Sequence, residues 1–341
     1  MMMNFLKIFS ISRNSQVPLY LQIFEAVQNG VRSGIIPSGQ ALPSINDLCT
    51  ELDLSRNTVE KGYQQLVKSG MVVSKQGKGF YIKPEARSRK RILLLFNKIS
   101  VHKKLVFDAF VRKINQVASV DLCVYNNDLQ ELRQVLTERR TAYNSFVLIP
   151  PCQATQEDID SIISIIPPHE MFILNHKVDV RRLYKGSVYE DFEKDIFLAM
   201  VQLIEKLRKY KKISIIFPVL APYPLGIING LKKFCKVNNF TFERVDDIAS
   251  TELSINTVYI SLLEDDLMIL LEKIPDSLLR VGKDIGLISY NDTPLKKHIL
   301  NGLTTISADF QMMGNMMADL VMGDRSDQLT VPFYVTSRNS L

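Results

Sequence analysis

LDLSRNTVEKGYQQL, residues 52–66, is the stretch that decides the architecture at the start of this 341-residue chain. Val59, Tyr63 and Leu66 recur at the spacing of one helical face, which predicts a helix packed on a core. Ser55 can accept from the free N–H groups of the first turn and is the predicted N-cap. Side chains able to donate to phosphates and base edges follow it: Arg56, Asn57, Thr58 and Lys61. On an isolated helix such a row is usually just a solvated face, so the neighbouring segments decide its meaning.

A second short helix is predicted immediately upstream, in LPSINDLCTEL, residues 42–52. Ser44 is its predicted N-cap, and Asp47 completes a capping box three residues later. Its apolar stripe comprises Ile45, Leu48, Cys49 and Leu52. Only residues 53–54 separate the two helices, so they must cross sharply, as in a helix-turn-helix.

The flanking segments extend this motif on both sides. VPLYLQIFEAVQNGVRSG, residues 17–34, predicts a helix that starts after Pro18 and is closed by Gly34. MVVSKQGKGFYI, residues 71–82, predicts a β-hairpin with a basic, glycine-containing tip. Together these elements predict a winged helix over residues 1–83.

Residues 15–83 resemble the DNA-binding domain of GntR-family transcription regulators. The resemblance rests on LPS at 42–44, SRNTV at 55–59 and GKG at 77–79, in order and at the right spacing. Many members carry an arginine where this chain has Asn46 and another where it has Glu60, so the operator sequence cannot be transferred. The resemblance and the polar row together predict these DNA-binding residues: Ser44, Asn46, Ser55, Arg56, Asn57, Thr58, Lys61, Gln76, Gly77 and Lys78.

Charge and composition agree with a DNA-binding N-terminal domain. Residues 1–90 hold 12 basic and 6 acidic residues, whereas the remainder holds 30 of each, so the excess positive charge lies where phosphate would be met. No apolar run approaches the roughly 20 residues that span a bilayer, and residues 1–9 are too short for a secretory signal. The four cysteines, Cys49, Cys123, Cys152 and Cys235, form no C-x-x-C pair and suit buried thiols in a reducing, cytoplasmic setting. We expect no metal site and no cofactor.

A basic linker, residues 84–91, is predicted to end the winged helix. It is either a solvated connection or an additional phosphate contact. Beyond it, short apolar runs typical of buried parallel strands alternate with helical segments, which predicts a two-lobed α/β domain over residues 92–341. The predicted strands lie at 91–96, 121–125, 145–150, 171–175, 212–217, 257–262 and 285–290, and the predicted helices at 104–118, 129–140, 156–166, 190–210, 226–238 and 265–274.

Residues 91–341 resemble the effector domain of lactose-repressor-type regulators, which share the fold of periplasmic sugar-binding proteins. The resemblance is carried mainly by SYND at 289–292, LTTI at 303–306 and MG at 313–314. It implies a ligand cleft at the carboxyl ends of parallel strands, where amide and carboxylate groups suit polyhydroxylated ligands. By position the cleft would receive Asn97, Lys98, Asn175, Asp191, Tyr223, Asn291 and Asp292. Sugar-binding members often carry an arginine where this chain has Ile227, so the sugar is not identified.

The fold class expected is therefore multidomain: an N-terminal winged helix-turn-helix followed by a two-lobed parallel-sheet domain. The predicted function is a transcription regulator whose binding to a palindromic operator is controlled by a small-molecule effector; the resemblance implies a repressor and a sugar effector, a monosaccharide. We expect a homodimer, because one recognition helix covers too few base pairs. No aminotransferase-type lysine motif, phosphate loop, G-x-S-x-G or H-E-x-x-H is present, so an enzyme is not expected. The alternative is an effector-independent or architectural DNA-binding protein with a degenerate cleft.

Overall fold

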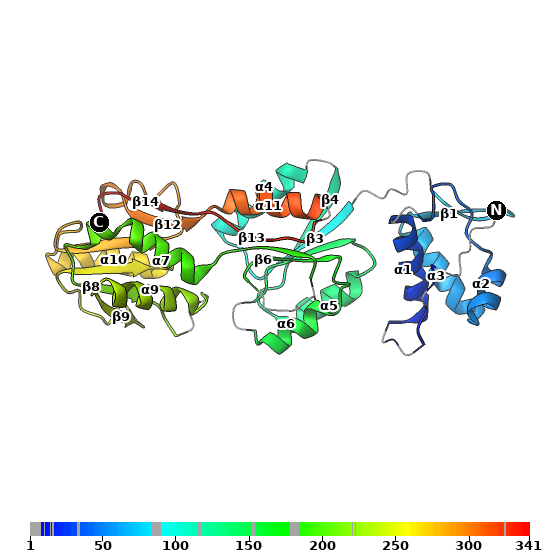
Figure 1. The fold of residues 1–341 in the computed structure, drawn as a ribbon, viewed down its shortest axis with the longest axis horizontal. Helices are drawn as coiled ribbons and strands as arrows, with labels where there is room; N and C mark the ends of the chain where they lie inside the picture. Colours follow the sequence, from blue (N-terminus) through cyan, green and yellow to red (C-terminus); the bar gives the residue numbers. More distant parts are fainter. Residues whose placement is uncertain are drawn as a thin grey trace. The chain divides into compact units, whose positions relative to one another are not determined.

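The computed structural model describes residues 8, 9, 11–13, 15, 17–32, 35–83, 90–114, 117–151, 154–177, 184–219, 221, 223–323 and 325–341. Two units emerge from its contacts. The first ends at Arg91 and also takes in two short stretches, 117–119 and 141–144; the second contains the rest. Figure 1 traces the helices and strands from blue at the N-terminus to red at the C-terminus. Within the described residues, no helix is long and apolar enough to cross a membrane.

The first unit contains the predicted winged helix. Its elements are α1 (Leu19–Arg32), α2 (Ile45–Leu52), α3 (Arg56–Lys68) and the antiparallel strands β1 (Val72–Lys75) and β2 (Gly79–Ile82). The predicted caps are confirmed, since Ser44 Oγ accepts from Asp47 N over 3.1 Å and Ser55 Oγ accepts from Thr58 N over 3.2 Å. Asp53 adopts a left-handed φ of 51° between α2 and α3, which lets two short helices meet across a tight turn.

The core of the winged helix is built from the predicted apolar stripes. Ile23 of α1 packs with Val59, Tyr63 and Leu66 of α3, and all four are completely buried. The Tyr63 hydroxyl donates to the Pro43 carbonyl over 2.8 Å, which satisfies its polar end and ties α3 to the segment before α2. This packing fixes the angle at which the polar start of α3 leaves the core.

The second unit consists of two lobes, each built on a six-stranded sheet. The first sheet has the order β13-β7-β6-β5-β3-β4 and the second β14-β12-β11-β10-β8-β9. The strands are β3 (Lys90–Phe96), β4 (Ala118–Val124), β5 (Ser145–Leu148), β6 (Met171–Asn175), β7 (Gly186–Tyr189), β8 (Lys212–Ile216), β9 (Thr241–Val245), β10 (Thr257–Ser261), β11 (Ile285–Tyr290), β12 (Thr304–Ala308), β13 (Gln328–Thr330) and β14 (Phe333–Thr336). The helices are α4 (Val101–Ile114), α5 (Leu129–Arg139), α6 (Gln156–Ile163), α7 (Phe192–Gln202), α8 (Ile204–Leu207), α9 (Gly226–Val237), α10 (Glu264–Ser277) and α11 (Phe310–Met322), with a 3₁₀ turn η2 (Ile299–Asn301).

The parallel-sheet prediction is confirmed for both lobes. β10 pairs in parallel with β8 and β11, and β5 pairs in parallel with β3 and β6. The one antiparallel partner in the second sheet is β14, which runs beside β12. Parallel strands align their carboxyl ends at one edge of a sheet, so both lobes offer strand-end loops for a site.

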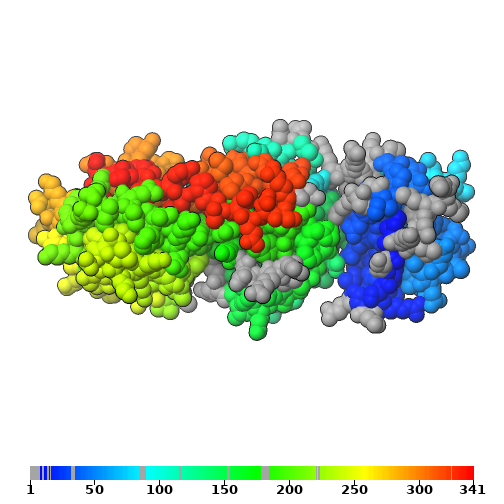
Figure 2. Space-filling view, in the orientation of Figure 1, coloured from blue at the N-terminus to red at the C-terminus, as the bar shows by residue number. Residues whose placement is uncertain are grey.

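The chain passes between the two lobes at three places: after β7, before α11, and between β13 and β14. These crossings run side by side, because Val331 N donates to Tyr189 O and Asp309 N donates to Pro332 O, each over 2.9 Å. Figures 1 and 2 show the result, in which the orange and red segment containing α11 and β13 returns to the lobe formed by cyan and green elements. Such adjacent crossings form a natural hinge between two lobes.

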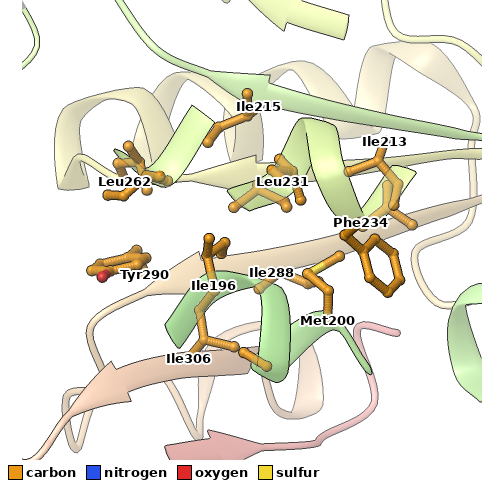
Figure 3. Packing of buried hydrophobic residues seen from close by; sticks show 14 of the residues in the cluster. Ile196, Met200, Ile213, Ile215, Leu231, Phe234, Leu262, Ile288, Tyr290 and Ile306 are labelled. Atoms are coloured by element: carbon orange, nitrogen blue, oxygen red, sulfur yellow. The ribbon is translucent and has the colours of Figure 1, made fainter. Parts of the chain in front are cut away.

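The second lobe is a three-layer sandwich. Ile196 and Met200 of α7 and Leu231 and Phe234 of α9 cover one face of its sheet, where they meet Ile288 (Figure 3). Residues of α10 cover the opposite face, where they pack against Tyr259 of β10 and Leu287 of β11. Because both faces are covered, the strands are apolar throughout their length, as the continuous runs in the sequence predicted.

Two glycines permit unusually close packing of helices. A Cβ added at Gly314 in α11 would lie 2.3 Å from the Val106 carbonyl oxygen of α4. A Cβ added at Gly230 in α9 would lie 2.2 Å from the Glu193 carbonyl oxygen of α7. Both distances are far below van der Waals contact, so only glycine lets these helix pairs approach as they do.

Several boundaries differ from the predictions. The helix predicted over 190–210 is divided at Leu203, whose φ of −91° and ψ of −1° separate α7 from α8. Ala118 begins β4 instead of ending the preceding helix. Lys90 and Arg91 belong to β3, so the predicted linker, 84–91, is two residues too long, and its remaining residues, 84–89, lie outside the described part of the chain. Gly34 and Cys152 also lie outside it, and β7, β9, β12, β13 and β14 were not predicted as strands.

Candidate functional site

The start of α3 presents the polar row predicted to meet DNA. Arg56, Asn57 and Lys61 are exposed, whereas the hydroxyls of Ser55 and Thr58 lie 2.8 Å apart and are engaged in the helix cap. Arg56 does not extend freely into solvent. Its Nε donates to Glu60 Oε1 over 2.7 Å, and its Nη1 donates to Asn46 Oδ1 over 3.2 Å. The guanidinium is thus held between α2 and α3, with 68% of the side chain exposed.

The predicted wing tip is the turn that joins β1 to β2. Gln76, Gly77 and Lys78 are all exposed at this turn. Gly77 has φ +70° and Gly79 has φ +95°, conformations that glycine adopts without strain. The tip therefore offers an exposed cation, Lys78, on a tight turn that can approach a nucleic acid backbone.

A pocket of about 330 Å³ lies between the two lobes of the second unit. The loops after β5 and β6 of the first lobe, the first crossing and the starts of α7 and α9 surround it. Its lining residues are Pro150, Pro151, Ala154, Gln156, Ile159, His176, Lys177, Glu190, Asp191, Phe192, Glu193, Pro224 and Gly226. A space of this size suits a small molecule.

Two ionisable groups of this pocket, Glu190 and His176, have pKa values shifted toward their uncharged forms. Glu190 is 4% exposed, and burial, with a contribution from the Asp195 carboxylate, raises its pKa to about 8. The Tyr290 hydroxyl, from the second lobe, lies 3.5 Å from Glu190 Oε2. Burial and the neighbouring Lys103 lower the pKa of His176 to about 4. A neutral carboxylic acid and a neutral imidazole can each donate and accept a hydrogen bond.

Among the residues predicted to bind an effector, only Asp191 lines this pocket. It is the N-cap of α7, accepting from Lys194 N over 3.3 Å. Asn175 directly precedes the lining residue His176, has φ +76°, and accepts from Glu190 N through its carbonyl. Tyr223 likewise directly precedes the lining residue Pro224. Strand ends therefore do converge here, as expected for parallel sheets.

Asn291 lies at the end of β11, next to Tyr290, with φ +63°. Its Nδ2 donates to the Tyr223 hydroxyl over 3.2 Å, and the two tyrosine rings, Tyr223 and Tyr290, meet edge to face. Asn291 is 6% exposed, and its Oδ1 has no hydrogen-bond partner among the described residues. An unpaired buried amide oxygen is costly, so a donor is expected to satisfy it when the protein functions.

Asn97 and Lys98 follow β3 in the first lobe. The Asn97 side chain is already engaged on both sides, donating to Asn127 Oδ1 over 2.9 Å and accepting from Lys103 Nζ. Lys98 is half-buried. Neither residue lines the pocket described above. In the described structure Asn97 orders the loop after β3.

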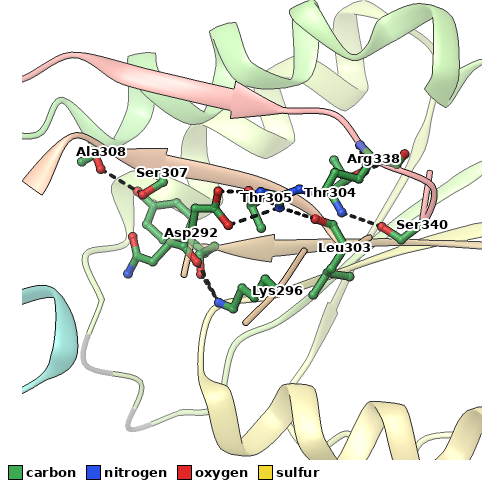
Figure 4. A network of polar contacts seen from close by, with 11 residues as sticks. Asp292, Lys296, Leu303, Thr304, Thr305, Ser307, Ala308, Arg338 and Ser340 are labelled. Atoms are coloured by element: carbon green, nitrogen blue, oxygen red, sulfur yellow. Dashed lines mark hydrogen bonds and ion pairs between the residues drawn. The ribbon is translucent and has the colours of Figure 1, made fainter. Parts of the chain in front are cut away.

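Asp292 pairs with Arg338 inside the second lobe. Both of its carboxylate oxygens accept from the Arg338 guanidinium, over 3.2 and 2.8 Å (Figure 4). Arg338 also donates to the Leu303 carbonyl over 2.6 Å, and Lys296 Nζ donates to the Asn291 carbonyl over 2.7 Å. The Asp292 carboxylate is thus occupied within the second lobe, where it anchors the C-terminal segment, and it is not among the pocket residues.

Sequence reasoning missed His176, Lys177, Glu190 and Glu193. The signal that could have found them was position, because His176 follows β6 directly and Glu190 follows β7. β7 was not recognised as a strand, so the residue after it was not considered.

Residues 19–82 match the family model described as "Bacterial regulatory proteins, gntR family". Two relatives from Bacillus subtilis (strain 168) are similar over part of the chain. The uncharacterised HTH-type transcriptional regulator YurK is 33% identical over 82 residues, which cover 24% of this chain and 34% of YurK. The HTH-type transcriptional repressor YtrA is 33% identical over 78 residues, which cover 23% of this chain and 60% of YtrA. The matches thus span less than two thirds of either relative.

Solved structures show the fold of most of the chain. The trehalose repressor of Escherichia coli superposes with a TM-score of 0.61 at 14% identity, covering 73% of this chain and all of that one. A regulator of the LacI family from Enterococcus faecium, solved with bound ribose, gives a TM-score of 0.59 at 16% identity, covering 74% of this chain and 98% of that one. A winged helix of the GntR type therefore precedes a two-lobed domain with the fold of these repressors.

Proposed function

We propose that this protein is a DNA-binding transcription regulator whose affinity for its operator is controlled by a small molecule bound between the lobes of the second unit. The observation that carries the proposal is the polar start of α3, capped by Ser55 and headed by Arg56, within a winged helix of the GntR type. The protein acts by binding rather than by catalysis. Repression controlled by a sugar is the mode that we propose, because YtrA and the trehalose repressor are named repressors and the Enterococcus faecium regulator was solved with bound ribose.

Arg56 is the side chain that we expect to contribute most to sequence recognition. An arginine at the start of a recognition helix can donate two hydrogen bonds to guanine O6 and N7 in the major groove. Arg56→Ala should weaken binding to the cognate duplex by about 1 to 3 kcal/mol and leave the fold unchanged. Fluorescence anisotropy with a duplex selected by the wild-type chain measures this loss.

Lys78→Ala provides the comparison for that experiment. If Lys78 contacts phosphate, its replacement by alanine should weaken binding to cognate and scrambled duplexes alike and reduce the salt slope by about one. Unchanged cognate affinity in a folded Arg56→Ala protein would remove Arg56 from the interface. An effect of Lys78→Ala confined to the cognate duplex would mean that the wing reads bases.

A neutral, polyhydroxylated effector is the ligand that the second unit suits best. Glu190 and His176 line the pocket and, in their uncharged forms, can each pair with a hydroxyl; Asn291 does not line it, but its Oδ1 is unpaired and it adjoins Tyr290, whose hydroxyl lies 3.5 Å from Glu190. Phe192, Pro150 and Pro151 offer apolar surface to the carbon face of a ring. Each ligand hydroxyl both donates and accepts, which matches this lining.

Asn291→Gly should abolish the effector response while leaving operator binding intact. Glycine accepts the φ of +63° without strain, so the change removes the amide and preserves the backbone. In a thermal-shift screen against a monosaccharide panel, the effector should raise the melting temperature of the wild type, because a ligand that binds only the folded state stabilises it. The variant should show no such rise.

Asn126→Gly is the matched control, since Asn126 also has a left-handed φ, of 49°, but is exposed on a loop of the first lobe. It should respond to the sugar as the wild type does. A full response in the Asn291→Gly protein would exclude Asn291 from the effector site. If no sugar stabilises the wild type, the alternative of effector-independent DNA binding is favoured.

We further propose that the regulator acts as a homodimer on a palindromic operator. A single α3 can read only a few base pairs, which is too little to distinguish one site among those of a genome. Two copies related by a twofold axis would place two recognition helices in successive major grooves. A change in lobe angle within such a dimer would alter the spacing of the helices, and so the affinity for the operator.

A further inference from the structure

We infer that Glu60 and Asn46 are positioning residues that fix which edge of the Arg56 guanidinium faces DNA, and that Glu60 thereby sets base selectivity. This inference rests on the proposed function, because it concerns how Arg56 reads a base. It assigns roles to the two positions at which this chain lacks the arginines that many GntR-family members carry. It also reverses the simple expectation that an acidic residue on a recognition helix only repels phosphate.

The inference rests on two hydrogen bonds that restrain the Arg56 side chain from two sides. Glu60 lies one turn after Arg56 on α3, and its Oε1 accepts from Arg56 Nε over 2.7 Å. Asn46 lies on α2, and its Oδ1 accepts from Arg56 Nη1 over 3.2 Å. One contact comes from the same helix and the other from the neighbouring helix, so the guanidinium is restrained in direction as well as in rotamer.

These two hydrogen bonds determine which N–H groups of the Arg56 guanidinium remain available to a base. A guanidinium has five N–H donors, and a bidentate contact to guanine uses two of them on one edge. With Nε occupied by Glu60, the edge that contains Nε is unavailable. A bidentate contact must therefore use the Nη1–Nη2 edge. Nη1 carries two N–H groups, so it can donate to Asn46 on α2 with one and to a base with the other.

Prior restraint of this kind changes both affinity and selectivity. A free arginine loses rotamer entropy on binding and can turn to meet phosphate or any base with a suitable acceptor. A restrained arginine loses less entropy at its preferred base and cannot adapt to another one. The Glu60 carboxylate also opposes close approach to phosphate, which lowers affinity for all sequences equally. Glu60 should therefore reduce total affinity and increase discrimination.

Two rival readings make different predictions. As an ordinary i,i+4 ion pair on an exposed helix, the Arg56–Glu60 contact would add little to stability and leave base selection unchanged. As a direct reader, Glu60 would accept from a cytosine amine and select its own base pair, independently of Arg56. The positioning role alone requires that Glu60 and Arg56 govern the same base pair.

The experiment starts with selection of duplexes from a randomised pool by the full-length wild-type chain. Single-base variants of the enriched duplex then give the discrimination ratio at each base pair for the wild type, Arg56→Ala, Glu60→Ala and Glu60→Gln. Glu51→Gln is the control, because it removes the same charge from an exposed residue of α2 whose side chain is not among the hydrogen-bond or ion-pair partners of Arg56 in the described structure. The double variant Arg56→Ala/Glu60→Ala completes a mutant cycle.

Glu60→Ala should tighten binding to scrambled duplexes and reduce discrimination about tenfold at the base pair where Arg56→Ala acts. Glu60→Gln should keep discrimination within about threefold of the wild type, because its amide oxygen can still accept from Arg56 Nε. In the double variant the loss of discrimination should not exceed that of Arg56→Ala alone. Glu51→Gln should leave discrimination unchanged.

Unchanged discrimination in Glu60→Ala, with tighter binding to all duplexes, would overturn the inference and leave simple repulsion. Loss of discrimination at a different base pair from that of Arg56→Ala would also overturn it, in favour of direct reading by Glu60. If the wild-type chain enriches no sequence at all, the proposed function itself fails, and the inference fails with it. The three results are distinct in a single data set.

Discussion

Gly314→Ala should destabilise the second unit by about 3 kcal/mol, although glycine-to-alanine changes inside exposed helices usually stabilise a protein. An added Cβ would lie 2.3 Å from the Val106 carbonyl oxygen, 3.0 Å from the Ala109 Cβ and 3.1 Å from the Phe110 nitrogen. Two of these atoms belong to the α4 backbone, so no side-chain rotation relieves the clash. The two helices must separate, and the apolar contacts between them are weakened along their length.

Urea denaturation measures this loss as a lower midpoint with an unchanged slope. Gln311→Ala, at an exposed position of the same helix, is the control and should change stability by less than about 0.5 kcal/mol. A Gly314→Ala protein as stable as the wild type would show that α4 and α11 can part at little cost, against the close packing described here.

Glu190→Gln should raise stability at alkaline pH. The pKa of Glu190 is about 8 in the folded protein, against about 4.5 in an unfolded chain, so folding favours the protonated acid. The contribution is fully present below about pH 4.5 and is lost as the pH rises through about 8, because the unfolded chain ionises first. Glutamine keeps the shape and cannot ionise, so the variant should be more stable by about 4 kcal/mol above pH 8.

Denaturation midpoints at pH 5, 7 and 9 would reveal this as a difference between the two proteins that widens with pH. Glu193→Gln is the matched control, since Glu193 also lines the pocket but is exposed and should show no such trend. Parallel stability curves for the wild type and Glu190→Gln would mean that Glu190 is ionised in the folded protein, and that the pocket carries a negative charge at its centre.

Much of the fold could be predicted because its signals are local. The caps at Ser44 and Ser55 and the glycines of the wing tip follow from the nearest few residues, and the continuous apolar strands follow from burial on both faces. β13 and β14 could not be predicted in the same way, since each is held by a partner distant in sequence, β7 and β12 respectively. The division between α7 and α8 likewise depends on how Leu203, Leu207 and Tyr210 enter a shared core.

The same difference between local signals and tertiary contacts applies to the candidate sites. The exposed polar row on α3 is a property of one helix, and it lies where the sequence placed it. The partners of Arg56 and Asp292 belong to tertiary structure, because Asn46 lies on another helix and Arg338 stands 46 residues further along the chain. Glu190 was missed because the strand that it follows, β7, was not predicted, and the burial that raises its pKa comes from tertiary structure.

Operator affinity measured with and without effector tests the central claim most directly. The full-length wild-type chain would be titrated against the duplex it selects and against a scrambled duplex, in the presence and absence of the sugar that stabilises it in the thermal-shift screen. We predict a twofold-symmetric selected sequence, strong preference over the scrambled duplex, and a change in operator affinity of about tenfold or more on adding the sugar. Equal affinity for both duplexes, or operator affinity that no stabilising sugar alters, would contradict the account.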